Sequence, residues 1–162
     1  MFLNILVAVD GSPSSERALR EAVDLARSGN AKLTLMAVAP PVSGFVTLAR
    51  TTPEAMAAEL DKWAADVLAE AARSVPDDVL AHTVQASGHA GPEILKEAMR
   101  GGYDLIVLGT RGRGRAQEGV FGSVNGYVHF RARVPILSVP AIAAARTKGR
   151  RREPPRPPRR TR

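Results

Sequence analysis

The residues best suited to chemistry are the glycines and the serine between Gly109 and Ser123. Gly109, Gly112 and Gly122 follow a short apolar segment, and Ser123 comes directly after the last of them. Glycine lets backbone N–H groups approach a ligand closely. Ser123 begins a predicted helix over 123–131, whose first turn offers unpaired N–H donors and a partial positive charge. This combination predicts an anion site; the alternative is a flexible loop whose glycines serve only as turn residues.

Several better-known kinds of site are excluded. No Gly-Lys-Ser/Thr step follows the glycines, as a P-loop requires, and no Gly-x-Gly-x-x-Gly opens the first predicted helix. The three histidines have no partners at metal-ligand spacing, so no metal site is predicted. No group of side chains has the makings of an acid, a base and a nucleophile. We therefore predict ligand binding without catalysis, or at most slow hydrolysis.

The elements that position the loop alternate between apolar strands and amphipathic helices. The strands are predicted over 4–9, 32–38, 79–85, 105–108 and 134–139. The helices are predicted from a cap at Ser14 or Ser15 to residue 28, and over 53–73, 92–100 and 123–131. Uniformly apolar strands that alternate with helices predict an α/β fold, with a parallel sheet covered by helices on both faces.

Ligands of such sheets bind outside the carboxyl ends of the strands. Three candidate pieces end at that edge: Asp10 follows the first strand, Val38 ends the second, and Gly109 follows the fourth. Parallel strands bring these ends together whatever the motif, so we expect the three residues to lie near one another. Asp10 has a second interpretation, as a turn residue that bonds to its own backbone.

The pattern Gly109-x2-Gly112-x9-Gly122-Ser123 resembles the nucleotide-binding motif of the universal stress protein family. Residues 5–12 are similar to that family's opening strand and acidic turn. Residues 103–109 resemble its fourth strand, and residues 134–139 resemble its closing strand. Four segments in the family's order, spread over residues 2–140, argue against a chance match.

The resemblance implies a five-stranded, Rossmann-like parallel sheet of the adenine nucleotide alpha hydrolase-like type, a homodimer, and the branch of the family that binds ATP. In that branch Asp10 would lie near the ribose, the backbone of Val38 would contact adenine, and the glycines would line the phosphates. The implied nucleotide-binding residues are Asp10, Val38, Gly109, Gly112, Gly122, Ser123, Val124 and Asn125. The implied cofactor is ATP, with or without Mg2+, and the implied role is nucleotide-dependent regulation of a stress response.

Position 125 departs from the family's usual pattern. A small hydroxyl residue is common there, whereas this chain has Asn125. The amide of asparagine can still hydrogen-bond a phosphate or a ribose, so the nucleotide-binding prediction is retained.

The net charge of +7 is concentrated after residue 145. Residues 146–162 contain nine basic residues and one acid, a charge of +8, and the preceding 145 residues are nearly neutral at −1. We predict a folded domain over 1–145 and a disordered Pro- and Arg-rich tail over 146–162, which has too little apolar surface to fold alone. The tail fits a solubilising extension, a non-specific nucleic-acid contact, or a polyproline segment that binds an acidic or other protein partner.

Three further features of the sequence bear on the cellular compartment of the protein. The chain has no cysteine, which is compatible with a reducing compartment. The first residues lack the basic start of a signal peptide, and no apolar run approaches the roughly 20 residues of a membrane span. We therefore predict a cytoplasmic protein without a membrane contact.

Two rival functions remain open at this point. In the first, the body is a dimeric interaction module, and the basic tail recruits nucleic acid or a protein partner. In the second, the protein is a slow ATPase or phosphotransferase that depends on Asp10. The sequence does not indicate which stress or which downstream partner is involved.

Overall fold

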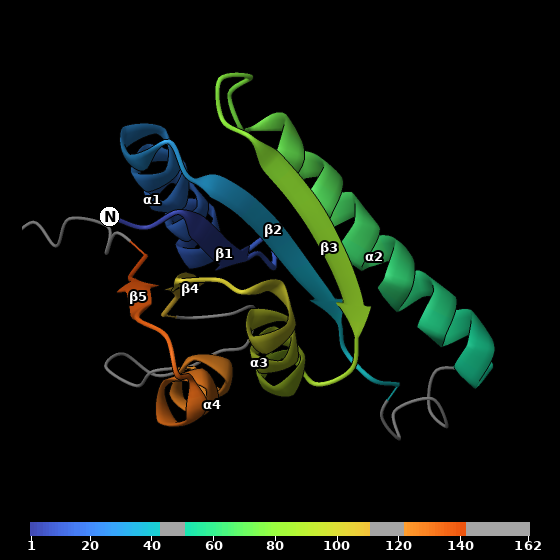
Figure 1. The fold of residues 1–162 in the computed structure, drawn as a ribbon. Helices are drawn as coiled ribbons and strands as arrows, with labels where there is room; N and C mark the ends of the chain where they lie inside the picture. Colours follow the sequence, from blue (N-terminus) through green and yellow to red (C-terminus); the bar gives the residue numbers. More distant parts are fainter. Residues whose placement is uncertain (43–50, 111–121, 142–162) are drawn as a thin grey trace, which may run out of the picture.

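The computed structural model describes residues 1–42, 51–110 and 122–141, and at its centre is one sheet of five parallel strands (Figure 1). The strands are β1 (Asn4–Ala8), β2 (Lys32–Ala39), β3 (Ala81–Ser87), β4 (Leu105–Gly109) and β5 (Ile136–Val139). Their order across the sheet is β3-β2-β1-β4-β5, so the chain starts in the middle and builds outward in both directions. The predicted parallel α/β architecture is confirmed.

The reversal of strand order places helices on both faces of the sheet (Figure 1). The helices are α1 (Pro13–Gly29), α2 (Pro53–Arg73), α3 (Ala90–Gly101) and α4 (Ser123–Arg131). Right-handed crossovers put α1 and α2 on one face and α3 and α4 on the other. None of the described helices is long and apolar enough to cross a membrane.

β1 shows why the strands read as continuous apolar runs. Ile5 and Val7 pack under α1 and α2, whereas Leu6 packs under α3 and α4, and all three side chains are fully buried. Complete burial of such a side chain contributes about 2 kcal/mol. A strand covered on both faces has no solvent-exposed position, so its sequence does not alternate.

Two strands begin later than the sequence predicts. β3 lies two residues beyond the predicted 79–85, because its pattern is weak: its residues are exposed or only half-buried. Its end is set by its neighbour, since β2 continues to Ala39 and the ladder pairs Ala39 with Ser87. β5 likewise begins at Ile136, two residues after its predicted start. Neither shift changes the topology.

Two helix starts also differ from the prediction. α3 begins at Ala90, so Pro92 is its third residue and not its first. Ser12 caps α1 through its side chain, whereas Ser14 and Ser15, the predicted caps, lie inside the first turn and are buried. Proline is tolerated throughout the first turn of a helix, which explains why its position alone did not locate the start of α3.

Two adjacent glycines at the end of α3 are needed for different reasons, one for packing and the other for its backbone conformation. A Cβ at Gly101 would collide with the ring of buried Tyr103, whereas Gly102 has open space around it but a φ of +63°. We expect Gly101→Ala to lower the free energy of unfolding by about 1–3 kcal/mol through overpacking. Gly102→Ala should cost about 1–2 kcal/mol because alanine is strained in the left-handed region.

The asparagine variants distinguish the two causes in urea unfolding. Gly102→Asn should be less destabilising than Gly102→Ala, because asparagine adopts the left-handed conformation more readily. Gly101→Asn should be at least as destabilising as Gly101→Ala, since it adds atoms beside the same ring. An asparagine that improved on alanine at both positions would contradict the assignment.

Candidate functional site

The turn after β1 is held rigid by its own side chains. The Asp10 carboxylate accepts a hydrogen bond from the backbone N–H of Ser12 at 2.9 Å, which is the turn role that the sequence left open. The Ser15 hydroxyl in turn accepts from the backbone N–H of Asp10 at 3.3 Å. Asp10 is half-buried and therefore keeps one side toward solvent at the carboxyl edge of the sheet. Its proposed contact with a ribose stays a prediction.

Val38 lies where β2 outruns β1. β1 ends at Ala8, and the next N–H, of Val9, donates to the carbonyl of Met36 at 2.8 Å. The backbone groups of alternate residues in a parallel strand face the same neighbour. Val38, two residues beyond Met36, therefore turns its N–H and C=O toward the side of β2 that β1 has already left. This position leaves backbone groups open to a ligand, and the contact of Val38 with adenine stays a prediction.

Gly109, at the end of β4, is pressed against the beginning of α1. A Cβ on Gly109 would lie 2.6 Å from the Ser14 hydroxyl and 2.8 Å from the backbone N of Ser15. Backbone atoms cannot move aside as the end of a flexible side chain can, so this position requires glycine. The sequence indicated a glycine for phosphate approach, and the structure adds a packing reason that it did not indicate.

The two ends of the glycine-rich loop meet. The N–H of Gly122 donates to the carbonyl of Thr110 at 2.9 Å, and the N–H of Thr110 donates to the carbonyl of Val139 on β5 at 2.9 Å. The loop therefore starts and finishes at one point beside β4. Gly112, a predicted phosphate contact, lies outside the described residues.

The helix that follows the loop begins without a side-chain cap. Gly122 is the N-cap residue of α4, and the first intrahelical bond joins the N–H of Gly126 to the carbonyl of Gly122 at 3.0 Å. Ser123 is exposed and Val124 is half-buried, and the first turn contains no acidic residue. The helix dipole and the first-turn N–H groups favour an anion at this end. α1 differs, because the Ser12 hydroxyl accepts from the N–H of Ser15.

Asn125 points into the protein and ties three elements together. Its side-chain amide donates to the carbonyl of Gly109 at 3.2 Å, and its amide group lies 3.1 Å from the Ser138 hydroxyl on β5. The Ser138 hydroxyl also lies 2.7 Å from Nε2 of His129. One assignment satisfies every group: His129 donates to Ser138, Ser138 donates to the Asn125 oxygen, and the Asn125 nitrogen donates to Gly109. We call these four residues the brace.

The brace changes how Asn125 is understood. Its side chain is 2% exposed and is already hydrogen-bonded within the protein. It fixes the first glycine of the motif relative to α4 and β5. The sequence reasoning missed His129 and Ser138, although a serine inside an otherwise apolar strand was a usable signal. The phosphate contact predicted for Asn125 stays a prediction.

The candidate site consists of the carboxyl ends of three neighbouring strands. These ends offer backbone N–H donors and one carboxylate, that of Asp10 in the turn after β1. β2, β1 and β4 are neighbours in the sheet, so Val38, Asp10 and Gly109 lie along one edge. The described residues contain no group of three histidine, aspartate or glutamate side chains that could hold a metal ion. The arrangement is chemically suited to a ligand with an anionic end and a polar, planar end.

The chain was compared with protein families and with known proteins. The model of the universal stress protein family matches residues 1–140. Universal stress protein YxiE of Bacillus subtilis is 33% identical over 147 residues, covering 86% of this chain and 99% of that protein.

Solved structures share the fold. A universal stress protein in complex with cAMP has a TM-score of 0.63 at 23% identity, covering 86% of this chain and 98% of that one. A universal stress protein family protein from Arabidopsis thaliana with AMP bound has a TM-score of 0.55 at 20% identity, covering 87% of this chain and 93% of that one. The family model, the bacterial relative and the shared fold agree: this chain belongs to the universal stress protein family.

Proposed function

We propose that this protein binds ATP, with or without Mg2+, at the carboxyl edge of β2, β1 and β4. In this proposal it acts in the cytoplasm as a nucleotide-dependent regulator of a stress response. One observation carries the proposal: the loop closed by the bond between Thr110 and Gly122 delivers the uncapped start of α4 beside Gly109. That geometry concentrates backbone N–H donors where a phosphate chain would lie.

The other end of the site suits an adenosine. The backbone of Val38 offers one donor and one acceptor on its open side, and adenine presents an amino donor and ring-nitrogen acceptors. Asp10 supplies a carboxylate that accepts from hydroxyl groups, as a ribose provides. The structural relatives bound to cAMP and AMP support an adenine nucleotide over another anion.

Binding fits the site better than catalysis does. Efficient phosphoryl transfer requires an acid that holds the metal and a group that positions water. Asp10 provides one carboxylate, and one of its oxygens is already bonded to the N–H of Ser12. We therefore propose that hydrolysis is slow or absent and that the bound nucleotide serves as a signal.

We also propose a homodimer formed through β5, the edge strand beside β4. The carbonyls of Pro135 and Val139 accept from β4 and Thr110, so the alternate residues Ile136 and Ser138 turn their backbone groups outward. An edge strand with unpaired backbone groups is a template for another strand. Phe130, on the preceding helix α4, is 89% exposed and is a large apolar side chain open to solvent.

The nucleotide proposal is tested by calorimetry with ATP, in the presence and absence of Mg2+. We expect binding by the native protein and at least a tenfold loss of affinity, about 1.4 kcal/mol, in Gly122→Val. Valine accepts the φ of −55° at Gly122, so the backbone conformation can be kept while we expect the side chain to block the approach of phosphate. Gly126→Val, in open space one turn further along α4, is the matched control and should keep its affinity. Absence of binding to the folded native protein at millimolar ATP would refute the proposal.

The brace gives a second prediction about affinity. Ser138→Ala leaves Asn125 without its partner on β5, so we expect a loss of about 1–2 kcal/mol in unfolding free energy and weaker ATP binding. Ser138→Thr keeps the hydroxyl and should retain most of the affinity. Ser74→Ala removes a hydroxyl that donates to the Ala71 carbonyl at the far end of α2, and it should leave affinity unchanged. Equal ATP affinity in Ser138→Ala and the native protein would show that the brace does not contribute to ATP binding.

The dimer is tested by light scattering on two variants of one residue. Ile136→Pro removes an outward N–H without disturbing the ladder to β4, and we expect it to weaken the dimer. Ile136→Ala shortens the same side chain but keeps the N–H, so it should remain dimeric. A native protein that is monomeric at all concentrations would remove this part of the proposal.

A further inference from the structure

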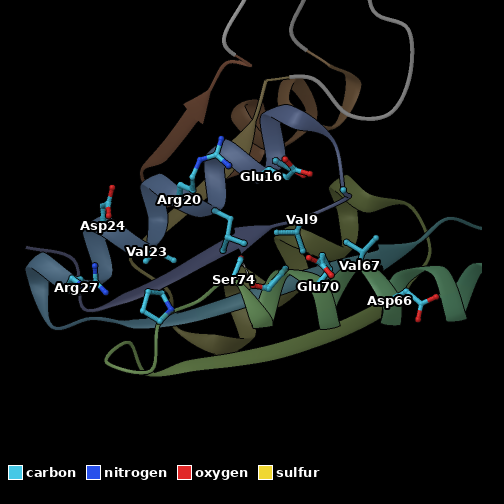
Figure 2. A pocket seen from close by; sticks show the side chains of 15 residues that line it. Val9, Glu16, Arg20, Val23, Asp24, Arg27, Asp66, Val67, Glu70 and Ser74 are labelled. Carbon is cyan, nitrogen blue, oxygen red and sulfur yellow. Dashed lines mark hydrogen bonds between the residues drawn. The ribbon is translucent and has the colours of Figure 1, made fainter.

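A groove of about 820 Å³ separates α1 from α2 on the face of the sheet opposite α3 and α4 (Figure 2). Its volume lies in the range of sites that hold a ligand or a peptide segment. The apolar part of the lining consists of Val9, Leu19, Val23, Val67, Ala71 and Pro76. The groove includes none of the residues proposed to contact the nucleotide. Its end at the carboxyl edge of the sheet reaches Gly11, the residue after Asp10.

The rim of the groove is acidic. Four carboxylates line it, from Glu16 and Asp24 on α1 and from Asp66 and Glu70 on α2. Figure 2 shows Glu16 and Asp24 on α1, and Asp66 and Glu70 on α2 with Val67. Glu16, Asp24 and Asp66 are exposed and form no ion pair with any described residue.

Glu70 is paired with Arg73, and two guanidinium groups line the groove beside the other carboxylates. They belong to Arg20 and Arg27, and Arg27 donates two hydrogen bonds to Asp78, at 2.7 and 2.8 Å. This exposed pair holds the pKa of Asp78 below its ordinary value through the hydrogen bond from Arg27. The groove therefore offers an apolar floor between carboxylates, which suits a segment that is both apolar and cationic.

The chain itself contains such a segment. Residues 146–162 combine eight arginines and one lysine with four prolines and a single acid, Glu153. Proline supplies apolar surface and little conformational entropy to lose on binding, and arginine forms bidentate contacts with carboxylates. The body of the protein is close to neutral, so the acidic rim is a local feature and not a general property of the surface.

The end of β5 brings this segment to the correct helix. The guanidinium of Arg17 on α1 donates to the carbonyl of Pro140 at 3.1 Å, so the described chain ends against α1. The next 21 residues, 142–162, span up to about 65 Å at the 3.1 Å per residue of a polyproline helix. A helix with its side chains is about 10 Å across, so the segment is long enough to pass over α1 and lie along the groove.

We propose that the groove between α1 and α2 binds the Pro- and Arg-rich segment 146–162 of the same chain. Its prolines pack on the floor that includes Val23 and Val67, and its arginines pair with the carboxylates of the rim. The attraction is largely electrostatic at the surface, so it weakens as salt is added. A segment bound in the groove would cover the end lined by Gly11, next to the turn that contains Asp10.

Paramagnetic relaxation enhancement in the full-length protein tests this contact. The chain has no cysteine, so Thr161→Cys provides a single site for a nitroxide label. We expect the label to broaden the amide signals of groove residues such as Arg20, Asp66 and Glu70, relative to the reduced label. The signals of α3, on the opposite face, should keep their intensity.

Charge reversal supplies the matched control. Asp24→Lys with Asp66→Lys should restore the intensity of the groove signals, because it replaces one carboxylate on each side of the groove. Glu54→Lys with Glu59→Lys makes the same charge change on α2 outside the lining and should leave the broadening intact. Broadening that is uniform, that lies on another face, or that survives the first double variant would overturn the proposal.

A mixture of isotope-labelled native protein with unlabelled, spin-labelled protein distinguishes one chain from two. The proposal is supported if the groove signals broaden when the isotope and the spin label are on the same chain and keep their intensity in the mixture. Equal broadening in the mixture would show that the segment binds a second copy, and it would overturn the contact within one chain. None of these readouts requires a nucleotide, so failure here is separate from failure of the ATP proposal.

Discussion

The contact between Gly109 and the first turn of α1 is the constraint on which the rest of the candidate site depends. A Cβ at this position would lie within 2.8 Å of the backbone of Ser15, so β4 and α1 approach this closely only with glycine there. Because Ser15 also bonds to Asp10, the same contact places the turn after β1 beside the end of β4. The brace then fixes Gly109 from the other side, through Asn125.

Periodicity predicted the number, type and order of the elements because the central strands β1, β2 and β4 are buried on both faces and the helices are not. The bounds were less certain where burial is weak: β3 takes its end from the length of β2, which no local pattern records. The edge that bears Asp10, Val38 and Gly109 could be predicted from topology alone, since parallel strands end together.

The parts that the sequence did not reveal depend on distances between elements. The packing role of Gly109 requires the position of α1, and the brace joins side chains from α4 and β5 that only the fold brings together. The groove is similar, because its width follows from how far apart the sheet holds α1 and α2. Such distances result from tertiary packing, whereas local spacing determines only which face a residue occupies.

The hydrogen bond between Gly122 and Thr110 has a consequence for how this fold can diversify. The two residues that flank segment 111–121 are joined to each other by this backbone bond, as the ends of an insertion are. Changing the length of a loop whose ends are fixed costs little, about 0.6 kcal/mol for each doubling. Natural variation can therefore lengthen or shorten this segment while the sheet, the helices and the brace stay unchanged.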